Sequence, residues 1–399
     1  MKHLLYLLLL PILCAYTPVI TPNGSSLPFT IAQDGAKEFH LIAQRVDQEF
    51  APGLIAHCWG YNGSTPGPTI EAVEGDHVRI YVTNQLPEVT SVHWHGLLIP
   101  NGMDGVKGLT QPGIPPGETF LYEFTLKQSG TYMYHSHTDE TIQQAMGLMG
   151  FFIIHPKHEE PHVDRDYAIF LQEWALTPGA CTPDPTVMLD FNYFTFNGKI
   201  FPATDALLAQ KGERVRLRFA NLTMDNHPIH IHGYAFTVTA NGGWRLPPAA
   251  QYQEGTVDVP VGTTRDVEFI ADVSGDWALH CHKSHHTMNG MAHGLPNLLD
   301  IELKGVVQKL QKILPGVHIM GTHGMEHMSQ MYENHPLPLP PNYFPPIGEP
   351  GQFGWINMGG MFTVVKVRNK LPPSGTDPGW YHNPPGTVAH PVSPPPSNY

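Results

Sequence analysis

Two segments of this 399-residue chain, 137 positions apart, share one sequence pattern. Residues 73–84 read Val-Glu-Gly-Asp-His-Val-Arg-Ile-Tyr-Val-Thr-Asn, and residues 210–221 read Gln-Lys-Gly-Glu-Arg-Val-Arg-Leu-Arg-Phe-Ala-Asn. In both, a turn signal at glycine precedes alternating apolar residues, a pattern typical of a half-buried β-strand. The chain is therefore a duplicated unit, which predicts two domains of similar fold.

The secondary structure expected from the sequence is almost entirely β. Alternating runs such as residues 119–126 and 265–273 are separated by turns that use many of the chain's 39 glycines and 40 prolines. Few stretches have helical periodicity. Short strands punctuated in this way predict β-sandwiches or barrels.

One cysteine lies between two histidines in the second half of the chain, as His280, Cys281 and His282. Because side chains alternate along a β-strand, the two histidines point to one face and the cysteine to the other. His286 and Met291 follow at short spacings. Cysteine, histidine and a weakly bound methionine are three of the four ligands of a blue-copper site. A metal held by this cysteine would be a few covalent bonds from two imidazoles aimed at other metal ions.

The missing histidine occurs in residues 227–233, His-Pro-Ile-His-Ile-His-Gly. His230 and His232 share one strand face, whereas His227, an odd number of positions away, points to the opposite face. The cysteine segment has the same parity. We therefore expect His227 beside Cys281, and the other two histidines beside the pair that flanks the cysteine.

Two further His-X-His pairs occur in the first half of the chain, His93 with His95 and His135 with His137. Eight paired histidines and one Cys-His-His-Met set are enough for four metal ions. Imidazole with thiolate favours copper or zinc, and a Cys-His₂ site with a distant methionine favours copper. A single pair can be incidental among 25 histidines, but four ordered pairs, one of them interrupted by the cysteine, favour metal ligation.

The first copy of the repeat has its paired histidines but lacks the blue-copper ligands. Residues without sulfur or imidazole stand at or near the three positions that correspond to His227, Cys281 and His286 in the second copy: Thr90, Ser136 and Thr141. The sequence therefore predicts one thiolate copper per chain, in the second copy only.

These motifs resemble those of the multicopper oxidases, the superfamily of laccases and bacterial copper-resistance oxidases, over most of residues 36–305. The resemblance also includes Asn-Gly-Ser-Thr-Pro-Gly-Pro-Thr-Ile at residues 62–70 and Ala-Met-Gly at residues 145–147. It implies an all-β fold of two cupredoxin-like domains, each a Greek-key β-sandwich or barrel. It also implies four copper ions per functional unit, one of type 1, one of type 2 and a type 3 pair.

The resemblance assigns each expected ligand to one of these ions. The type 1 copper is expected on His227, Cys281, His286 and Met291. The type 2 copper is expected on His93 and His230. The type 3 pair is expected on the remaining paired histidines, which are His95, His135, His137, His232, His280 and His282.

The chain departs from common laccases in domain number, because it has two cupredoxin-like domains where those have three. We expect residues 36–158 to form the first domain, and residues 164–305 with 356–370 to form the second. The chain thus resembles the two-domain laccases, in which histidines of one chain's first domain meet those of a neighbour's second domain. A linker near residues 157–164 leaves little freedom for them to meet within one chain. In the two-domain laccases three such chains close a ring, so the resemblance implies a homotrimer.

The arrangement implied by the resemblance is that of an oxidase. Single electrons from a small reducing substrate reach the type 1 copper, pass through Cys281, and reduce dioxygen to two waters at the paired histidines. The donor could be a phenol or a low-valent metal ion such as Cu(I), Fe(II) or Mn(II). Asp104, eleven residues after His93, matches a family carboxylate near the type 2 ion and is expected to relay protons. The simpler interpretation is a turn aspartate before Gly105.

Two other functions stay open from the sequence. An exported protein that sequesters or delivers copper would use the excess of histidine and methionine and would consume negligible oxygen. A two-domain copper nitrite reductase shares the fold and the trimer. That enzyme has no use for eight paired histidines, and it carries its blue copper in the first domain, where this chain has Ser136.

A long insertion separates the copper segment from the expected last strand at residues 359–368. An amphipathic helix is expected over residues 298–314, and the insertion, residues 306–355, continues with many methionines and histidines. Thioethers beside imidazoles suit Cu(I), but these methionines could equally pack a lid or a subunit contact. The Pro-rich tail, residues 371–399, is expected to be extended, either disordered or laid along a neighbour.

Charge and the N-terminus indicate where the protein works. With 22 basic and 35 acidic residues the net charge is −13, which disfavours nucleic acid and anionic membrane surfaces as partners. Residues 1–22 read as a signal peptide whose apolar run is too short for a comfortable membrane span. We expect export to the periplasm or the extracellular space, with Cys14 as a less favoured lipidation site. There, Cys58 and Cys181 could form a disulfide or stay as buried thiols.

Overall fold

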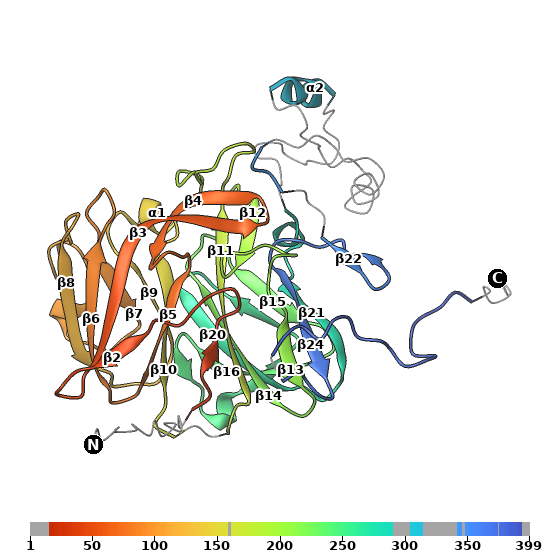
Figure 1. The fold of residues 1–399 in the computed structure, drawn as a ribbon, viewed down its shortest axis with the longest axis horizontal. Helices are drawn as coiled ribbons and strands as arrows, with labels where there is room; N and C mark the ends of the chain where they lie inside the picture. Colours follow the sequence, from red (N-terminus) through yellow and green to blue (C-terminus); the bar gives the residue numbers. More distant parts are fainter. Residues whose placement is uncertain are drawn as a thin grey trace, which may run out of the picture.

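The computed structural model describes residues 16–158, 161–289, 304–313, 341–344, 348–373 and 375–392. In these residues strands dominate and form two sandwich domains that lie side by side (Figure 1). The expected all-β, cupredoxin-like fold is confirmed.

The first domain consists of two sheets that enclose a core containing Trp94, Tyr134 and Phe152. One sheet has the order β2 (Phe29–Ile31), β3 (Lys37–Ala51), β6 (His77–Asn84) and β8 (Thr119–Thr125), with β4 (Leu54–Tyr61) paired to β3. The other has the order β5 (Gly67–Val73), β10 (Met149–His155), β9 (Gly130–Ser136) and β7 (Val92–His95). The two histidine pairs of this domain therefore lie at the ends of the neighbouring antiparallel strands β7 and β9.

The second domain is built in the same way. One sheet has the order β1 (Val19–Ile20), β11 (Arg165–Trp174), β14 (Arg214–Asn221), β20 (Thr263–Ile270), β16 (Phe236–Asn241) and β17 (Trp244–Arg245). β12 (Tyr193–Phe196) and β18 (Tyr252–Glu254) pair with β11 and β16. The other sheet has the order β13 (Leu207–Gln210), β24 (Phe362–Arg368), β21 (Gly275–Cys281), β15 (His227–Ile231) and β19 (Thr256–Val259).

The closing strands of the two domains correspond to each other. β10 pairs antiparallel with β9 and parallel with β5, and β24 pairs antiparallel with β21 and parallel with β13. β24 lies within residues 359–368, where the sequence predicts the last strand after the insertion. The repeat in the sequence is thus a repeat of the fold.

The two domains are joined by apolar and polar contacts. One apolar contact is a buried cluster formed by Val19, Met133, Met149, Phe151, Ile153, Ala168, Phe170 and Ala220. A second is a cluster in which Phe50 of the first domain packs with Trp174 of the second. Beside the first of these clusters, the guanidinium of Arg218 on β14 donates to Asp166 on β11 and to Thr131 on β9. Because charge-assisted bonds of this kind are strong and directional, the contact holds the first domain in one orientation on the second.

Residues 16–22, which the sequence analysis includes in the signal peptide, pack in the fold. β1 pairs in parallel with β11, and the ring of Tyr16 stacks on that of His155 with centroids 3.8 Å apart. Residues 1–15 lie outside the described residues, so the signal peptide stays a prediction. Across the described ranges, no helix has the length and apolar character needed to cross a membrane.

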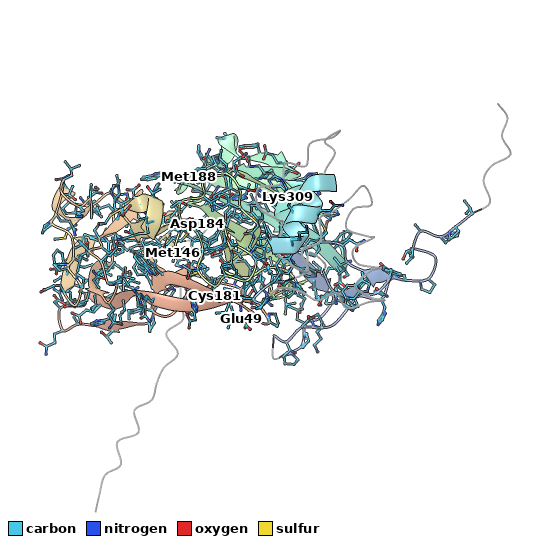
Figure 2. All side chains as sticks on the ribbon, turned by 90° about the horizontal axis from the view of Figure 1, so that it is seen from above. Glu49, Met146, Cys181, Asp184, Met188 and Lys309 are labelled. Carbon is cyan, nitrogen blue, oxygen red and sulfur yellow. The ribbon has the colours of Figure 1, made fainter. Side chains whose placement is uncertain are left out.

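Only parts of the insertion are described, namely helix α2 (Lys304–Ile313), residues 341–344 and the hairpin of β22 (Pro350–Gly351) and β23 (Gly354–Trp355). α2 falls within the expected helix over residues 298–314. Met291 and the Met/His-rich stretch lie outside the described residues. The tail is fastened by an ion pair of Asp377 with Lys366, and it then extends away from the body of the protein (Figures 1 and 2).

Cys58 and Cys181 are free thiols. Cys58 is buried in an apolar cluster with Phe50 and Trp174, whereas Cys181 is partly exposed. The two segments touch, because the backbone N–H of His57 donates to the carbonyl oxygen of Cys181. Of the two alternatives for this pair, the structure shows thiols, and only one of them is buried.

Candidate copper sites

His227, Cys281 and His286 converge in the second domain. The Sγ of Cys281 lies 3.9 Å from Nδ1 of His227 and 3.5 Å from Nδ1 of His286, and the two Nδ1 atoms are 3.0 Å apart. All three residues are fully buried. Bonds from a metal to nitrogen and sulfur are about 2.0–2.3 Å long, so three donors at these separations fit around one ion. A thiolate with two imidazoles suits copper.

The strand register explains why these residues meet. β15 and β21 are antiparallel neighbours with Ile229 opposite Cys281, so His227, two residues earlier on the same face, points at the sulfur. The 3-10 turn η3 (Ser284–Thr287) brings His286 back over the cysteine, and Phe194 stacks on its ring at 4.0 Å. Met291, the expected fourth ligand, lies outside the described residues.

The opposite face of the same strands carries a second-domain set of four histidines, which are His230, His232, His280 and His282. Their ring centroids lie 4.9–5.8 Å apart. The Nε2 atoms of His232 and His280 are 3.1 Å apart, and two facing ring nitrogens at this distance need a proton or a metal ion between them. The Nδ1–H of His280 donates to the carbonyl oxygen of Cys281, which leaves Nε2 for a metal.

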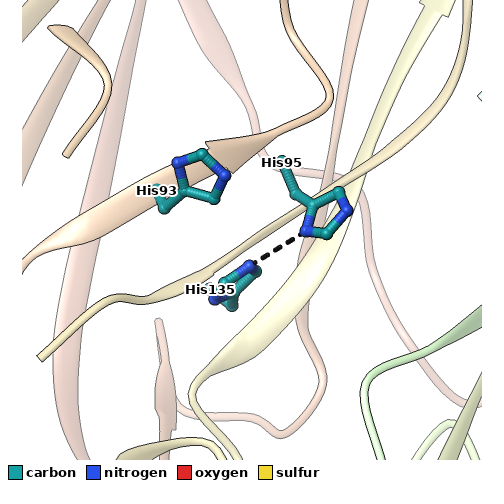
Figure 3. A group of neighbouring side chains, drawn as sticks. All are labelled: His93, His95 and His135. Atoms are coloured by element: carbon teal, nitrogen blue, oxygen red, sulfur yellow. Dashed lines mark hydrogen bonds between the residues drawn. The ribbon is translucent and has the colours of Figure 1, made fainter. Parts of the chain in front are cut away.

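A first-domain set of four histidines lies on two neighbouring strands. His93 and His95 are on β7, His135 is near the end of β9, and His137 directly follows β9. Their ring centroids lie 5.3–6.2 Å apart. Figure 3 shows the first three converging, with Nδ1 of His95 3.2 Å from Nε2 of His135. Their donor atoms can surround a metal ion.

Within one chain the two sets are apart. No ring contact between described residues joins a histidine of the first-domain set to one of the second-domain set. The first-domain set instead lines a cavity of about 460 Å³ together with second-domain residues that lie near His227, which are Glu173, Leu222, Thr223 and Met224. Each set therefore offers half of the imidazoles of an eight-histidine cluster.

In the first domain, the position that corresponds to the thiolate site is filled by side chains that hydrogen-bond to one another. The hydroxyls of Thr90 and Ser136 both donate to Oε1 of Gln143, and all three residues are buried. The sequence alignment placed Thr141 near the position of His286. The helical turn α1 (Glu140–Gln143) instead directs Gln143 inward and leaves Thr141 at the wall of the cavity.

Two carboxylates that no sequence motif indicates face the outer nitrogens of the two histidines beside Cys281. Oε1 of Glu173 is 3.3 Å from Nε2 of His227, and Oδ2 of Asp225 is 3.4 Å from Nε2 of His286. Metal-bound histidines commonly donate their second ring N–H to a carboxylate. For neither acid does the spacing between the acid and its histidine in the sequence indicate that the two are in contact.

Two carboxylates lie beside the first-domain set. Oε1 of Glu140 is 2.9 Å from Nδ1 of His137, and their i, i+3 spacing on a turn is a signal that sequence reasoning could have used. The carbonyl oxygen of Asp104 accepts a hydrogen bond from Nδ1–H of His93, and its Oδ1 lies 3.4 Å from the same nitrogen. These contacts leave Nε2 of both histidines for a metal.

Burial determines the protonation of the candidate ligands. Burial, followed by neighbouring histidines, lowers the pKa of His286 far below its usual value, and mainly burial lowers the pKa of His135 to about 3. These rings are neutral and can bind a metal without first losing a proton. Burial raises the pKa of the Cys281 thiol to about 12, so this thiol becomes a thiolate when a metal ion replaces its proton.

The fold and the two kinds of site define a copper protein of the cupredoxin type. Two sequence models described as multicopper oxidase match residues 43–159 and 180–298, which together are more than half of the chain. The chain belongs to the multicopper oxidase family, whose members bind copper.

Similar proteins agree with this assignment. The chain is 32% identical over 259 residues to copper resistance protein A of Escherichia coli, across 52% of this chain and 42% of that protein. The solved multicopper oxidase mgLAC superposes with a TM-score of 0.62 at 27% identity, covering 84% of this chain and 87% of that one. The blue copper oxidase of Nitrosomonas europaea gives 0.61 at 26% identity, covering 87% and 97%. The chain spans about half the length of the curated relatives that it matches.

Proposed function

We propose that this protein is an oxidase that couples one-electron oxidation of a small reducing substrate to the four-electron reduction of dioxygen to water. The observation that carries the proposal is the end of β21, where Cys281 faces the buried thiolate site while its neighbours His280 and His282 belong to the second-domain set. Electrons accepted at the sulfur side thus have a path of a few covalent bonds to the histidines. Bound copper would supply the one-electron redox chemistry that side chains lack.

The role of each residue in this proposal is the one that the family resemblance implies. The thiolate site is held by His227, Cys281 and His286, with Met291 as the expected fourth ligand. The type 2 ion is assigned to His93 and His230. The type 3 pair is assigned to the other six members of the two sets, His95, His135, His137, His232, His280 and His282.

Asp104 is proposed to deliver protons to the site of oxygen reduction. Its Oδ1 lies 3.4 Å from the ring of His93, and 32% of its side chain is exposed. The carboxylate can therefore exchange protons with solvent while it stays beside a proposed copper ligand. The carbonyl oxygen, which holds the ring of His93, does not depend on the nature of the side chain.

We also propose that the complete cluster is shared between chains of a homotrimer. The support is the separation of the two sets within a chain, because each set alone has four of the eight imidazoles. A neighbour's second-domain set, placed against the first-domain set, would complete the cluster. A heterologous contact of this kind closes into a ring when the rotation between chains permits it.

The donor class is proposed from the cavity, and the compartment is proposed from the N-terminal sequence. The cavity near His227 is lined by Trp174 and Phe191 as well as by Glu173, so it supports either a phenol or a low-valent metal ion as donor. Export to the periplasm or the extracellular space is proposed from the signal-like N-terminus.

Oxygen uptake by the copper-loaded protein tests the proposed function. Phenols, Cu(I), Fe(II) and Mn(II) are supplied separately, and nitrite is supplied under anaerobic conditions. We expect oxygen consumption with at least one donor, at four electrons per dioxygen, and no nitrite reduction. Apo-protein and Cys281→Ser are the controls, because Cu(I) and Fe(II) react with oxygen unaided. Copper binding without oxygen uptake would instead support a sequestering protein.

A further inference from the structure

We propose that the charge of Glu173, which is buried beside the ring of His227, lowers the reduction potential of the thiolate copper. The inference rests on the proposed function, because it assumes that copper binds at Cys281. Glu173 lies on β11 and does not bind the metal, but its charge would influence the first electron-transfer step.

The position of Glu173 is defined by two contacts on opposite sides of its carboxylate. Oε1 lies 3.3 Å from Nε2 of His227, and Oε2 accepts a hydrogen bond from the backbone N–H of Met224. The side chain is 1% exposed. Since Nδ1 of His227 faces Cys281, its Nε2 is the atom that carries a proton when copper is bound. The hydroxyl oxygen of Thr223, 3.0 Å from this nitrogen, is its hydrogen-bond partner, and the carboxylate of Glu173 lies beside the same nitrogen at 3.3 Å.

The charge of Glu173 has no cationic partner among the described residues. No lysine or arginine there lies within ion-pair distance of it, and its Oε1 has no hydrogen-bond partner. A buried carboxylate without a counter-charge is costly, so such groups are normally paired or bind a metal. The positive charge that the fold can place beside it is the copper ion held through His227.

Asp225 provides a matched comparison within the same site. Its Oδ2 lies 3.4 Å from Nε2 of His286, almost the same distance as in the Glu173 contact. Asp225 differs in its surroundings, because its side chain is 36% exposed and its Oδ1 is 3.3 Å from Nζ of Lys283. Solvent and the lysine therefore screen its charge.

The direction of the effect follows from charge balance. Cu(II) with one thiolate carries a net charge of plus one, and uptake of one electron gives Cu(I) with a net charge of zero. A nearby buried carboxylate stabilises the charged, oxidised form more than the neutral, reduced form. Removing the charge of Glu173 therefore favours reduction and raises the potential. The same change at Asp225 has a smaller effect.

The test compares Glu173→Gln with Asp225→Asn in the full-length protein. The midpoint potential of the thiolate copper is measured by anaerobic titration of its blue absorption, and thermal unfolding is measured on the apo-protein. We expect Glu173→Gln to shift the reduction equilibrium at least tenfold towards Cu(I), which is about 59 mV for one electron. Asp225→Asn should shift it by a smaller factor. Apo Glu173→Gln should unfold at the same temperature as the wild type or higher, because the substitution removes a buried, unpaired charge.

An unchanged or lowered potential in Glu173→Gln would overturn the proposal, and so would equal shifts in the two variants. A lower unfolding temperature of apo Glu173→Gln would also contradict it, because the charge of the carboxylate would then stabilise the apo-protein. A different result would contradict the proposed oxidase function. In that case the wild-type protein would contain a reduced thiolate copper and yet consume no oxygen.

Discussion

Cys281 connects the two kinds of site at the scale of single residues. Its sulfur faces His227 and His286 on one side of β21, and its own carbonyl oxygen accepts the Nδ1–H of His280 on the other. Cys281 thus provides the sulfur ligand and also orients the imidazole of His280. A serine at this position would keep the backbone bond and remove the thiolate.

Replacing Cys281 by serine is expected to abolish the blue absorption and oxygen consumption together. The physical reason is that a hydroxyl is a poor substitute for a soft thiolate ligand of copper. Absorption spectroscopy and oxygen uptake on the same copper-loaded sample check this, with Cys181→Ser as the control for loss of a thiol elsewhere. A blue variant, or one that turns over at the wild-type rate, would contradict the assignment.

Asp104→Asn is expected to slow oxygen reduction and to leave the blue absorption intact. The asparagine keeps the carbonyl oxygen that holds His93, and it removes only the group that can carry a proton. Stopped-flow reoxidation of the fully reduced protein measures the affected step directly. Reoxidation at the wild-type rate would show that Asp104 relays no protons and serves only as a turn residue.

Strand alternation was enough to predict which histidines lie beside Cys281 and which lie on the opposite face. This prediction succeeded because side-chain direction in a strand is a local property. Glu173 could not be predicted in the same way. Its contact with His227 depends on how β11 lies beside the segment that contains Met224, and no spacing in the sequence encodes that approach.

At the scale of elements, η3 and α1 follow corresponding strands of the two domains and position different kinds of side chain. η3 turns His286 onto the sulfur, whereas α1 places Gln143 between two hydroxyls and Glu140 on His137. The sequence predicted that the first copy lacks a thiolate site, since that follows from residue type alone. It did not predict Gln143, because the two loops differ in length and alignment cannot show which residue of a turn faces inward.

Gln143→Ala is expected to destabilise the protein by about 1–3 kcal/mol, because the hydroxyls of Thr90 and Ser136 lose their buried acceptor. Urea unfolding of the apo-protein measures this loss, and Thr141→Ala, a change at an exposed position of the same turn, is the matched control. The blue absorption per chain should be unchanged, since no thiolate copper binds in the first domain. A reduced blue absorption would show that this place does influence the copper site.

At the scale of the whole molecule, the repeat in the sequence was sufficient to predict two sandwich domains and the strand that closes the second. The repeat could not predict how the two domains face each other, because their orientation depends on the apolar clusters between them and on the contact of Arg218 with Thr131. This packing puts the first-domain set next to the outer side of His227 rather than next to the second-domain set. Under the proposed function, a neighbouring chain completes the eight-histidine cluster.

Complementation between two inactive variants tests this arrangement. His137→Ala removes a ligand of the first-domain set, and His232→Ala removes one of the second-domain set, so each variant alone is expected to lose oxygen reduction. In trimers formed by co-expression, an intact cluster arises wherever a His232→Ala chain presents its first domain to the second domain of a His137→Ala chain. With random assembly about a quarter of the clusters are intact. The thiolate copper of the His137→Ala chain feeds each of them. Oxygen uptake should therefore return to about a quarter of the wild-type rate, and light scattering should show three chains per particle. If each cluster formed within a single chain, mixing the variants would restore nothing.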